Sequence, residues 1–263
     1  MGQLLAITRA VSPAIARCEL THLSRVPIDP DKAAAQHADY ERALERMGCA
    51  VRRIAAGQDL PDSVFIEDAA VVLDEVAIVT RPGAESRRAE APGVAEALEP
   101  YRPLLVLEPP GTLDGGDVLV VGRSMFIGTS RRTNLAGIEQ MRHIAAPLGY
   151  AVRPVSVRGC LHLKSAVTSI DDQTLLVNRA WAPLEELRGF KFLDVDPGEP
   201  SAANIVRVGT RLLYSASFPR TRARIERRGF DVTAVDVSEL AKAEGAVTCC
   251  SLIFEESDCL SAA

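Results

Sequence analysis

Residues 64–80, VFIEDAAVVLDEVAIVT, contain two strand-like apolar runs joined by a turn. Later segments begin in the same way, namely DVLVVGRSMFIGTS (117–130), HLKSAVTSIDDQTLLVNR (162–179), NIVRVGTRLLYSA (204–216) and VTCCSLIFE (247–255), the last of which has no second run. Successive segments start 53, 45, 42 and 43 residues apart. A repeat of this length is typical of a propeller or another array of similar units.

Each pair of runs is followed by a helical pattern and a third strand-like run, so the repeating unit is strand–strand–helix–strand. The helical patterns cover residues 31–47, 93–99, 133–148, 183–188 and 219–228. The third runs are CAVRRI, LLVLEP, YAVRPVSV, KFLDVD and FDVTAVDV. The N-terminal LLAITRAV can supply the strand that the fifth unit lacks and thereby close a ring. We predict a single α/β domain over residues 1–255 and a flexible tail over residues 256–263.

Composition excludes several classes of partner. The chain has 30 Lys+Arg against 35 Asp+Glu, a formal net charge of −5, and no basic cluster that would favour nucleic acid or an anionic membrane. No apolar run approaches the roughly 20 residues of a membrane span. The 6 cysteines are too sparse for a disulfide scaffold and include no C-x-x-C motif. We therefore expect a cytoplasmic protein with free thiols.

Polar or reactive side chains mark the starts of four of the five units. They are Glu67-Asp68, the DGGD motif at 114–117, His162 and Cys249-Cys250. Taken singly, each could belong to a turn, an exposed edge or the core. A closed ring would bring them together at one end of a central channel. A cavity with carboxylates, an imidazole and a thiol suits a cysteine hydrolase or transferase that acts on a cationic small molecule.

The two adjacent cysteines cannot both serve such a site. On a strand, consecutive side chains point to opposite faces, so one thiol would face the cavity while the other packs in the core.

The remaining histidines, His22, His37 and His143, lack metal-ligand spacing. We therefore expect no metal.

Six motifs carry a resemblance to a known family. They are LPDSVFIEDAAVV, TRPGAESRR, TLDGGDVL, SRRTN, LHLKS and TCCS, in this order across nearly the whole chain. With them the sequence resembles the dimethylarginine dimethylaminohydrolases of the guanidine-modifying superfamily. The resemblance implies a five-bladed, pseudosymmetric α/β propeller of ββαβ modules around a central channel. It also implies hydrolysis of asymmetric dimethylarginine and monomethylarginine to citrulline plus dimethylamine or methylamine.

The resemblance assigns catalytic roles to three residues. Cys249 is the nucleophile and forms a covalent thiouronium intermediate, with Cys250 as its structural neighbour. His162 protonates the departing amine and later activates the hydrolytic water. Asp114 orients His162 or binds the guanidinium group.

The resemblance also assigns the substrate contacts. Glu67 and Asp68 are expected to bind the guanidinium group, whose N–H donors match ionised carboxylates. Arg87 and Arg132 are expected to hold the substrate carboxylate, where the bidentate geometry of arginine is useful.

Three further contacts complete the expected site. Asp62 and the backbone carbonyl of Leu20, in a mobile N-terminal loop, would accept hydrogen bonds from the α-amine. The backbone carbonyl of Ala243 would add a contact. No cofactor is expected, because a thiolate, a histidine and water supply the chemistry. The expected partner is a small cationic amino acid, bound by a monomer or a homodimer.

Three other functions stay open from the sequence. Arginine deiminases apply the same chemistry to unmethylated arginine, although they are typically longer. An amidinotransferase would use an amine acceptor in place of water. A catalytically silent protein could bind arginine derivatives without hydrolysing them.

Overall fold

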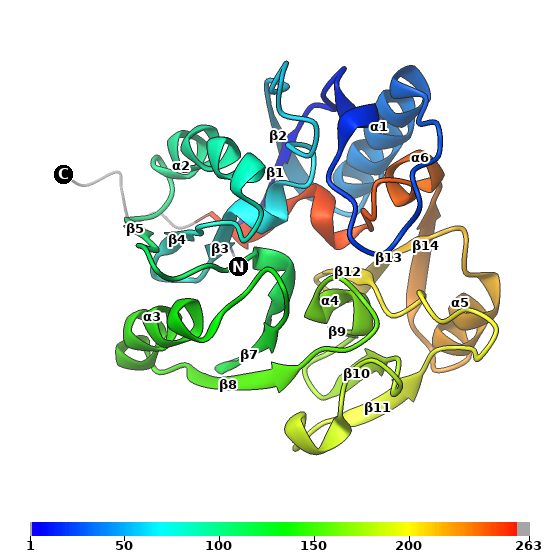
Figure 1. Cartoon of the computed structure of the whole chain (residues 1–263). Coiled ribbons are helices and arrows are strands. Elements are labelled where there is room, and N and C mark those ends of the chain that lie inside the picture. The colour runs from blue at the N-terminus through cyan, green and yellow to red at the C-terminus, as the bar shows by residue number, and fades with distance from the viewer. Residues whose placement is uncertain (1, 257–263) are drawn as a thin grey trace.

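A computed structural model describes residues 2–256 and shows five three-stranded sheets arranged around a central channel (Figure 1). This confirms the predicted α/β propeller. Most of the predicted tail, residues 257–263, lies outside the described residues.

Four of the sheets are built from consecutive strands. In each sheet the first strand pairs antiparallel with the second, and the second pairs parallel with the third across a helix or helical turn. The sheets are β3 (Ala70–Val72), β4 (Ala77–Val79) and β5 (Leu104–Val106); β6 (Val118–Val121), β7 (Ser124–Thr129) and β8 (Ala151–Ser156); β9 (Val167–Ser169), β10 (Thr174–Val177) and β11 (Lys191–Asp194); β12 (Ile205–Val208), β13 (Arg211–Ser215) and β14 (Asp231–Val235).

The fifth sheet closes the ring with strands from opposite ends of the sequence. The central strand β1 (Leu4–Arg9) pairs antiparallel with β15 (Leu252–Glu255) and parallel with β2 (Cys49–Ile54). Ile7 lies opposite Leu252 in this register. The predicted closure of the ring by the N-terminal strand is therefore confirmed.

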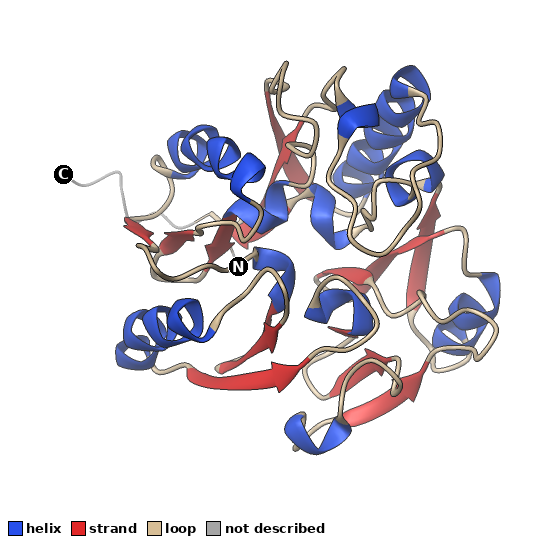
Figure 2. Cartoon of the chain, in the orientation of Figure 1, coloured by secondary structure: helices blue, strands red, loops and turns tan. Residues whose placement is uncertain are grey.

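The longer helices lie around the periphery of the ring (Figure 2). They are α1 (Pro30–Arg46), α2 (Ala91–Leu98), α3 (Leu135–Ala145) and α5 (Pro219–Glu226), accompanied by the single turns α4 (Leu163–Ala166) and α6 (Ser238–Ala241). The Asp29 side chain caps α1, and the Asn134 side chain caps α3 by accepting a hydrogen bond from the backbone N–H of Gly137. The pattern at 183–188 forms only a 3-10 turn, Leu184–Glu186. No helix among residues 2–256 is long and apolar enough to cross a membrane.

The prediction that Glu67-Asp68 and Cys249-Cys250 lie on strands is wrong, whereas the DGGD motif lies directly before its strand as predicted. Short helical turns stand there instead, at Ile66–Ala69, Gly115–Asp117 and Thr248–Cys250, and His162 directly precedes α4. A strand would send alternate polar side chains into apolar packing on the two faces of a buried sheet. The turns instead direct them toward charged and hydrogen-bonding partners at the mouth of the channel.

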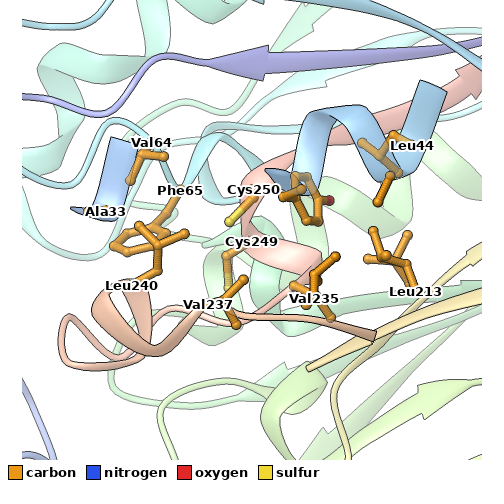
Figure 3. Packing of buried hydrophobic residues seen from close by; sticks show 14 of the residues in the cluster. Ala33, Leu44, Val64, Phe65, Leu213, Val235, Val237, Leu240, Cys249 and Cys250 are labelled. Carbon is orange, nitrogen blue, oxygen red and sulfur yellow. The ribbon is translucent and has the colours of Figure 1, made fainter. Parts of the chain in front are cut away.

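An apolar cluster surrounds the turn that contains the two cysteines (Figure 3). Phe65, Val237 and Leu240 pack there beside Cys249 and Cys250. Ser251, which follows the two cysteines, is held by Tyr40 of α1. The Tyr40 side chain is fully buried, and its hydroxyl group lies 2.7 Å from that of Ser251 in a hydrogen bond. The cysteine turn is thus fixed from behind by a packed helix.

Loss of packing at the closing strand should destabilise the ring. Ile7 is fully buried, so Ile7→Ala should lower the free energy of unfolding by about 3 kcal/mol. Leu105→Ala, on the exposed β5, should change it by less than about 0.5 kcal/mol. Urea unfolding followed by circular dichroism measures both. Equal effects of the two substitutions would show that β1 is not part of the cooperative core.

Candidate active site

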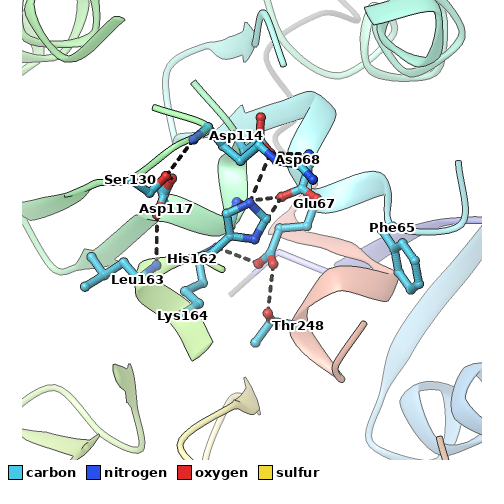
Figure 4. A network of polar contacts seen from close by, with 12 residues as sticks. Phe65, Glu67, Asp68, Asp114, Asp117, Ser130, His162, Leu163, Lys164 and Thr248 are labelled. Atoms are coloured by element: carbon cyan, nitrogen blue, oxygen red, sulfur yellow. Dashed lines mark hydrogen bonds and ion pairs between the residues drawn. The ribbon is translucent and has the colours of Figure 1, made fainter. Parts of the chain in front are cut away.

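Residues at the starts of the units line two different cavities. The central channel, of about 680 Å³, contacts Glu67 and Thr248. A small cavity of about 20 Å³ contacts the next residue of each turn, Asp68 and Cys249. Figure 4 shows the polar network between them. The small cavity has room for roughly one water molecule, so the site is closed.

The small cavity brings together seven of the ten residues singled out from the sequence. They are Asp62, Asp68, Arg87, Arg132, His162, Ala243 and Cys249. The other three lie close by. Asp114 supports His162 from behind, Glu67 faces the central channel, and Leu20 belongs to the loop that covers the cavity.

His162 is held between two buried carboxylates. Its Nε2 lies 3.0 Å from Oδ2 of Asp114, and its Nδ1 lies 3.8 Å from Oδ1 of Asp68. Burial alone would lower the imidazole pKa, but the charge of Asp68 and the hydrogen bond to Asp114 outweigh it and raise the pKa to about 9. His162 is therefore an imidazolium at neutral pH and can donate a proton.

Asp68 joins this histidine to an arginine. Its Oδ2 lies 2.6 Å from Nη1 of Arg87, and its Oδ1 accepts a 3.0 Å hydrogen bond from the backbone N–H of Gly116. Burial would raise the pKa of Asp68, but the charges of His162 and Arg87 lower it to about 2. A Cβ atom at Gly116 would lie only 2.6 Å from Nδ1 of His162, which explains why the DGGD motif needs glycine there.

The Cys249 thiol is buried in the wall of the cavity. Burial, followed by the charges of Glu67 and Asp68, raises its pKa to about 12. The closed site therefore holds a neutral thiol beside an imidazolium. The Cys250 thiol instead belongs to the packed core and donates to the carbonyl of Ala246 at 3.4 Å.

The two arginines of the cavity differ in how fully their guanidinium groups are used. Arg87 is completely engaged, because its nitrogens donate to Glu90, Asp68 and the backbone carbonyls of Asp62 and Phe65. The buried Nη1 of Arg132 has no hydrogen-bond partner and lies 3.5 Å from Oδ2 of Asp114. Arg132 therefore has a donor to offer a ligand, whereas Arg87 braces the carboxylates.

Glu67 supports the cysteine turn from the channel side. Its carboxylate pairs with Lys164 and accepts a 2.8 Å hydrogen bond from the Thr248 hydroxyl group. The side-chain amide of Asn204 holds the same threonine, because its Oδ1 accepts from the Thr248 backbone N–H and its Nδ2 donates to the Thr248 hydroxyl group, both at 3.0 Å. This carboxylate does not line the small cavity.

A short segment, residues 19–23, covers the cavity, and we call it the closing loop. The backbone N–H of Glu19 lies 3.0 Å from Oδ2 of Asp62, and the Thr21 hydroxyl group accepts a 3.2 Å hydrogen bond from Nη2 of Arg132. The loop thus occupies two groups that were expected to contact an amino-acid ligand. Sequence reasoning missed Glu19 and other lining residues, namely Phe65, Leu161, Glu244 and Gly245. The only signal for them is their position beside recognised motifs.

Comparison with known proteins places the chain in a family. The family described as N,N dimethylarginine dimethylhydrolase, eukaryotic, matches residues 24–177. The N(G),N(G)-dimethylarginine dimethylaminohydrolase of Streptomyces coelicolor is 42% identical over 255 residues, which cover 95% of this chain and 97% of the relative. The chain belongs to the dimethylarginine dimethylaminohydrolase family.

Solved structures of this family share the fold over the whole ring. A cysteine-to-serine variant of the Pseudomonas aeruginosa enzyme, complexed with citrulline, superposes with a TM-score of 0.91 at 34% identity and covers 97% of this chain and 100% of its own. A histidine-to-glycine variant of a dimethylarginine dimethylaminohydrolase, in an adduct with S-methyl-L-thiocitrulline, has a TM-score of 0.89 at 34% identity and the same coverage.

The carboxylate–histidine cluster also has the spacing of a metal site. The ligand atoms of Asp68, Asp114 and His162 lie within 4.8 Å of one another. A metal would have to displace the proton that the two carboxylates keep on His162. In the described structure these three residues instead satisfy one another as an ion-paired cluster.

Removing the charge of Asp114 should lower the pKa of His162. In Asp114→Asn the imidazole should titrate below the wild-type value of about 9, because the hydrogen bond and the charge of Asp114 are lost while Asp68 still raises the pKa. Because the folded-state pKa is raised, the ion pairs stabilise the fold fully below pH 6.5, and this contribution is lost as the pH rises through about 9.

Nuclear magnetic resonance of the histidine ring protons checks this expectation. Asp172→Asn, at an exposed carboxylate that pairs with Arg207, should leave the titration of His162 unchanged. An unaltered pKa in Asp114→Asn would contradict the assignment of Asp114 as the partner of His162.

Proposed function

We propose that this protein hydrolyses Nω-methylated arginines, asymmetric dimethylarginine and monomethylarginine, to citrulline and dimethylamine or methylamine. The observation that carries the proposal is the small cavity that joins the Cys249 thiol, the His162 imidazolium and the Asp68 carboxylate in a chain of this family. A thiol supplies a nucleophile, an imidazolium supplies a proton, and a carboxylate attracts a cationic guanidinium group.

In the first half of the reaction, the substrate guanidinium brings a positive charge next to Cys249. That charge favours transfer of the thiol proton to solvent water, because it opposes the effect of Glu67 and Asp68 on the Cys249 pKa. Sγ then attacks the guanidinium carbon. As the bond from carbon to the methylated nitrogen breaks, His162 gives its proton to the departing amine. The product of this step is a covalent thiouronium on Cys249.

The second half reverses the role of the histidine. His162, now neutral, accepts a proton from water as the water oxygen attacks the thiouronium carbon. The carbon–sulfur bond breaks, citrulline forms, and the cysteine sulfur regains its starting state. Asp114, 3.0 Å from Nε2, keeps the imidazole oriented through both proton transfers.

The amino-acid end of the substrate would replace contacts that the closing loop now makes. We assign the substrate carboxylate to Arg132, whose Nη1 has no hydrogen-bond partner. The α-amine would take the place of the Glu19 N–H at Asp62, with the carbonyls of Leu20 and Ala243 as further acceptors. Asp62 suits this role because it lies at the cavity wall and already accepts hydrogen bonds there.

Arg87 and Glu67 would act mainly through other residues. The fully used guanidinium of Arg87 fixes Asp68 and the backbone near Asp62, so its effect on the substrate carboxylate would be indirect. Glu67 would hold the cysteine turn through Thr248 and contribute negative charge next to the guanidinium site.

The setting of the protein is part of the same proposal. We assign it to the cytoplasm, where reducing conditions keep Cys18, Cys49, Cys160, Cys249 and Cys250 as free thiols. Its partner would be a small cationic amino acid, bound by a monomer or a homodimer.

A substrate panel tests the activity. Citrulline release from asymmetric dimethylarginine and from monomethylarginine should exceed release from arginine by at least about tenfold in kcat/KM. Glycine or another amine should not change the product, because water is the acceptor. Faster turnover of arginine would indicate a deiminase instead, and transfer to the amine would indicate an amidinotransferase. No turnover of any of them would leave only a binding protein.

Covalent labelling tests the nucleophile. 2-Chloroacetamidine carries an amidinium group that mimics the guanidinium, so it should alkylate Cys249 and abolish activity. Mass spectrometry should find the label on Cys249 in the wild type and in Cys250→Ala, and no label at this site in Cys249→Ser. Labelling of Cys250, or of neither residue, would contradict the assignment.

A further inference from the structure

One carboxylate outside the predicted site holds the closing loop in place. Oε2 of Glu244 accepts a 2.9 Å hydrogen bond from the backbone N–H of Thr21, and Oε1 accepts from the N–H groups of His22 and Leu23, the latter at 2.6 Å. Three consecutive N–H groups aimed at one carboxylate form an anion-binding concavity in the backbone.

The backbone of Glu244 has a left-handed conformation, which is costly for a residue with a side chain. Its φ of 61° is the only positive value at a non-glycine residue within 2–256. Glycine or asparagine would adopt this conformation at lower cost. Residues held in such conformations cluster at ligand clamps and switch regions.

Packing explains why the strained position cannot shift by one residue. A Cβ atom at Gly245 would lie 2.1 Å from Cε1 of Phe65, so position 245 must be glycine for close approach. The chain therefore passes between Phe65 and the closing loop, and it turns at Glu244. This path presents the Glu244 carboxylate to the loop and puts Ala243 at the wall of the small cavity.

The other contacts of the closing loop do not replace this one. Arg25, just after the loop, donates to the carbonyls of Ala16 and Cys18, just before it, so this contact joins the flanking segments and does not hold the loop against the rest of the fold. Glu19 accepts a hydrogen bond from Ser86, but both groups are exposed. The contacts with Asp62 and Arg132 use groups that a ligand would take over.

We propose that Glu244 is a positioning residue that latches the closing loop over the amino-acid end of the substrate. With the latch closed, the carbonyl of Leu20 and the hydroxyl group of Thr21 are fixed beside Asp62 and Arg132. Glu244 itself contacts neither the guanidinium group nor Cys249 in this scheme. The consequence for substrate binding rests on the proposed function, whereas the latch itself rests on the loop geometry.

Hydrogen exchange tests the latch without any need for activity. In Glu244→Gly the backbone strain is relieved but the acceptor is lost, so the amides of Thr21, His22 and Leu23 should exchange at least about tenfold faster than in the wild type. Glu244→Gln keeps one side-chain oxygen and should give an intermediate rate. Glu45→Gln, at an exposed position on α1, should have no effect.

Kinetics then test the coupling of the latch to binding. Glu244→Gly should raise KM for asymmetric dimethylarginine about tenfold and change kcat less than about threefold, because the reacting groups stay in place. Citrulline, which shares the amino-acid end, should bind about tenfold more weakly by calorimetry. A purely structural role would change neither KM nor the Kd of citrulline in a variant that unfolds normally.

The outcomes separate this proposal from the proposed function. Unchanged exchange at the three amides in Glu244→Gly would overturn the latch. Faster exchange with an unaltered KM and citrulline affinity would overturn its role in binding. A wild type that neither hydrolyses methylarginines nor binds citrulline would overturn the proposed function, while the exchange rates would still decide whether Glu244 holds the loop.

Discussion

The buried ion pairs of Asp68 are the interaction on which the site depends. One carboxylate faces two cations, Arg87 and His162, inside a protein interior where an unpaired charge would be very costly. Its pKa falls to about 2 while that of His162 rises to about 9, so each group keeps the other ionised across the neutral range. Both glycines of the DGGD motif serve this arrangement by allowing the backbone to approach closely.

The surroundings of Cys249 keep its thiol protonated in the closed site. A thiol with a pKa of about 12 is nearly unreactive toward passing electrophiles. Burial suppresses its ionisation most, followed by the charges of Glu67 and Asp68, and a cationic guanidinium would offset those two charges. Reactivity is therefore tied to the charge of the bound ligand. The closed cavity adds a second requirement, because the loop must give up its own hydrogen bonds before a ligand can enter.

The ring could be predicted from the sequence because its cause is local and repeated. Apolar runs, helix caps and stop glycines recur with a regular spacing, and the orphan run VTCCSLIFE requires a partner strand from elsewhere. The turns at Glu67 and Cys249 were not predictable in this way, since the apolar runs that contain them are typical of strands. Two other features cannot be predicted from neighbouring residues in the sequence. One is that Arg87 is bonded to carboxylates while Arg132 keeps a donor without a partner, and the other is the contact of Glu244 with the closing loop. Each depends on side chains far apart in the sequence.

The closing sheet has a consequence for how the protein is made. β15 follows the cysteine turn directly and pairs with β1. Residues near position 5 therefore cannot form these strand contacts until residues near position 254 have been synthesised. During synthesis, β1 can pair only with β2, and its other edge stays open. The cysteine turn directly precedes β15, so its thiol can join the imidazole and the carboxylates only after almost the whole chain has been made. A ribosome-bound nascent chain that ends before residue 248 therefore lacks both the cysteine turn and the strand that closes the ring.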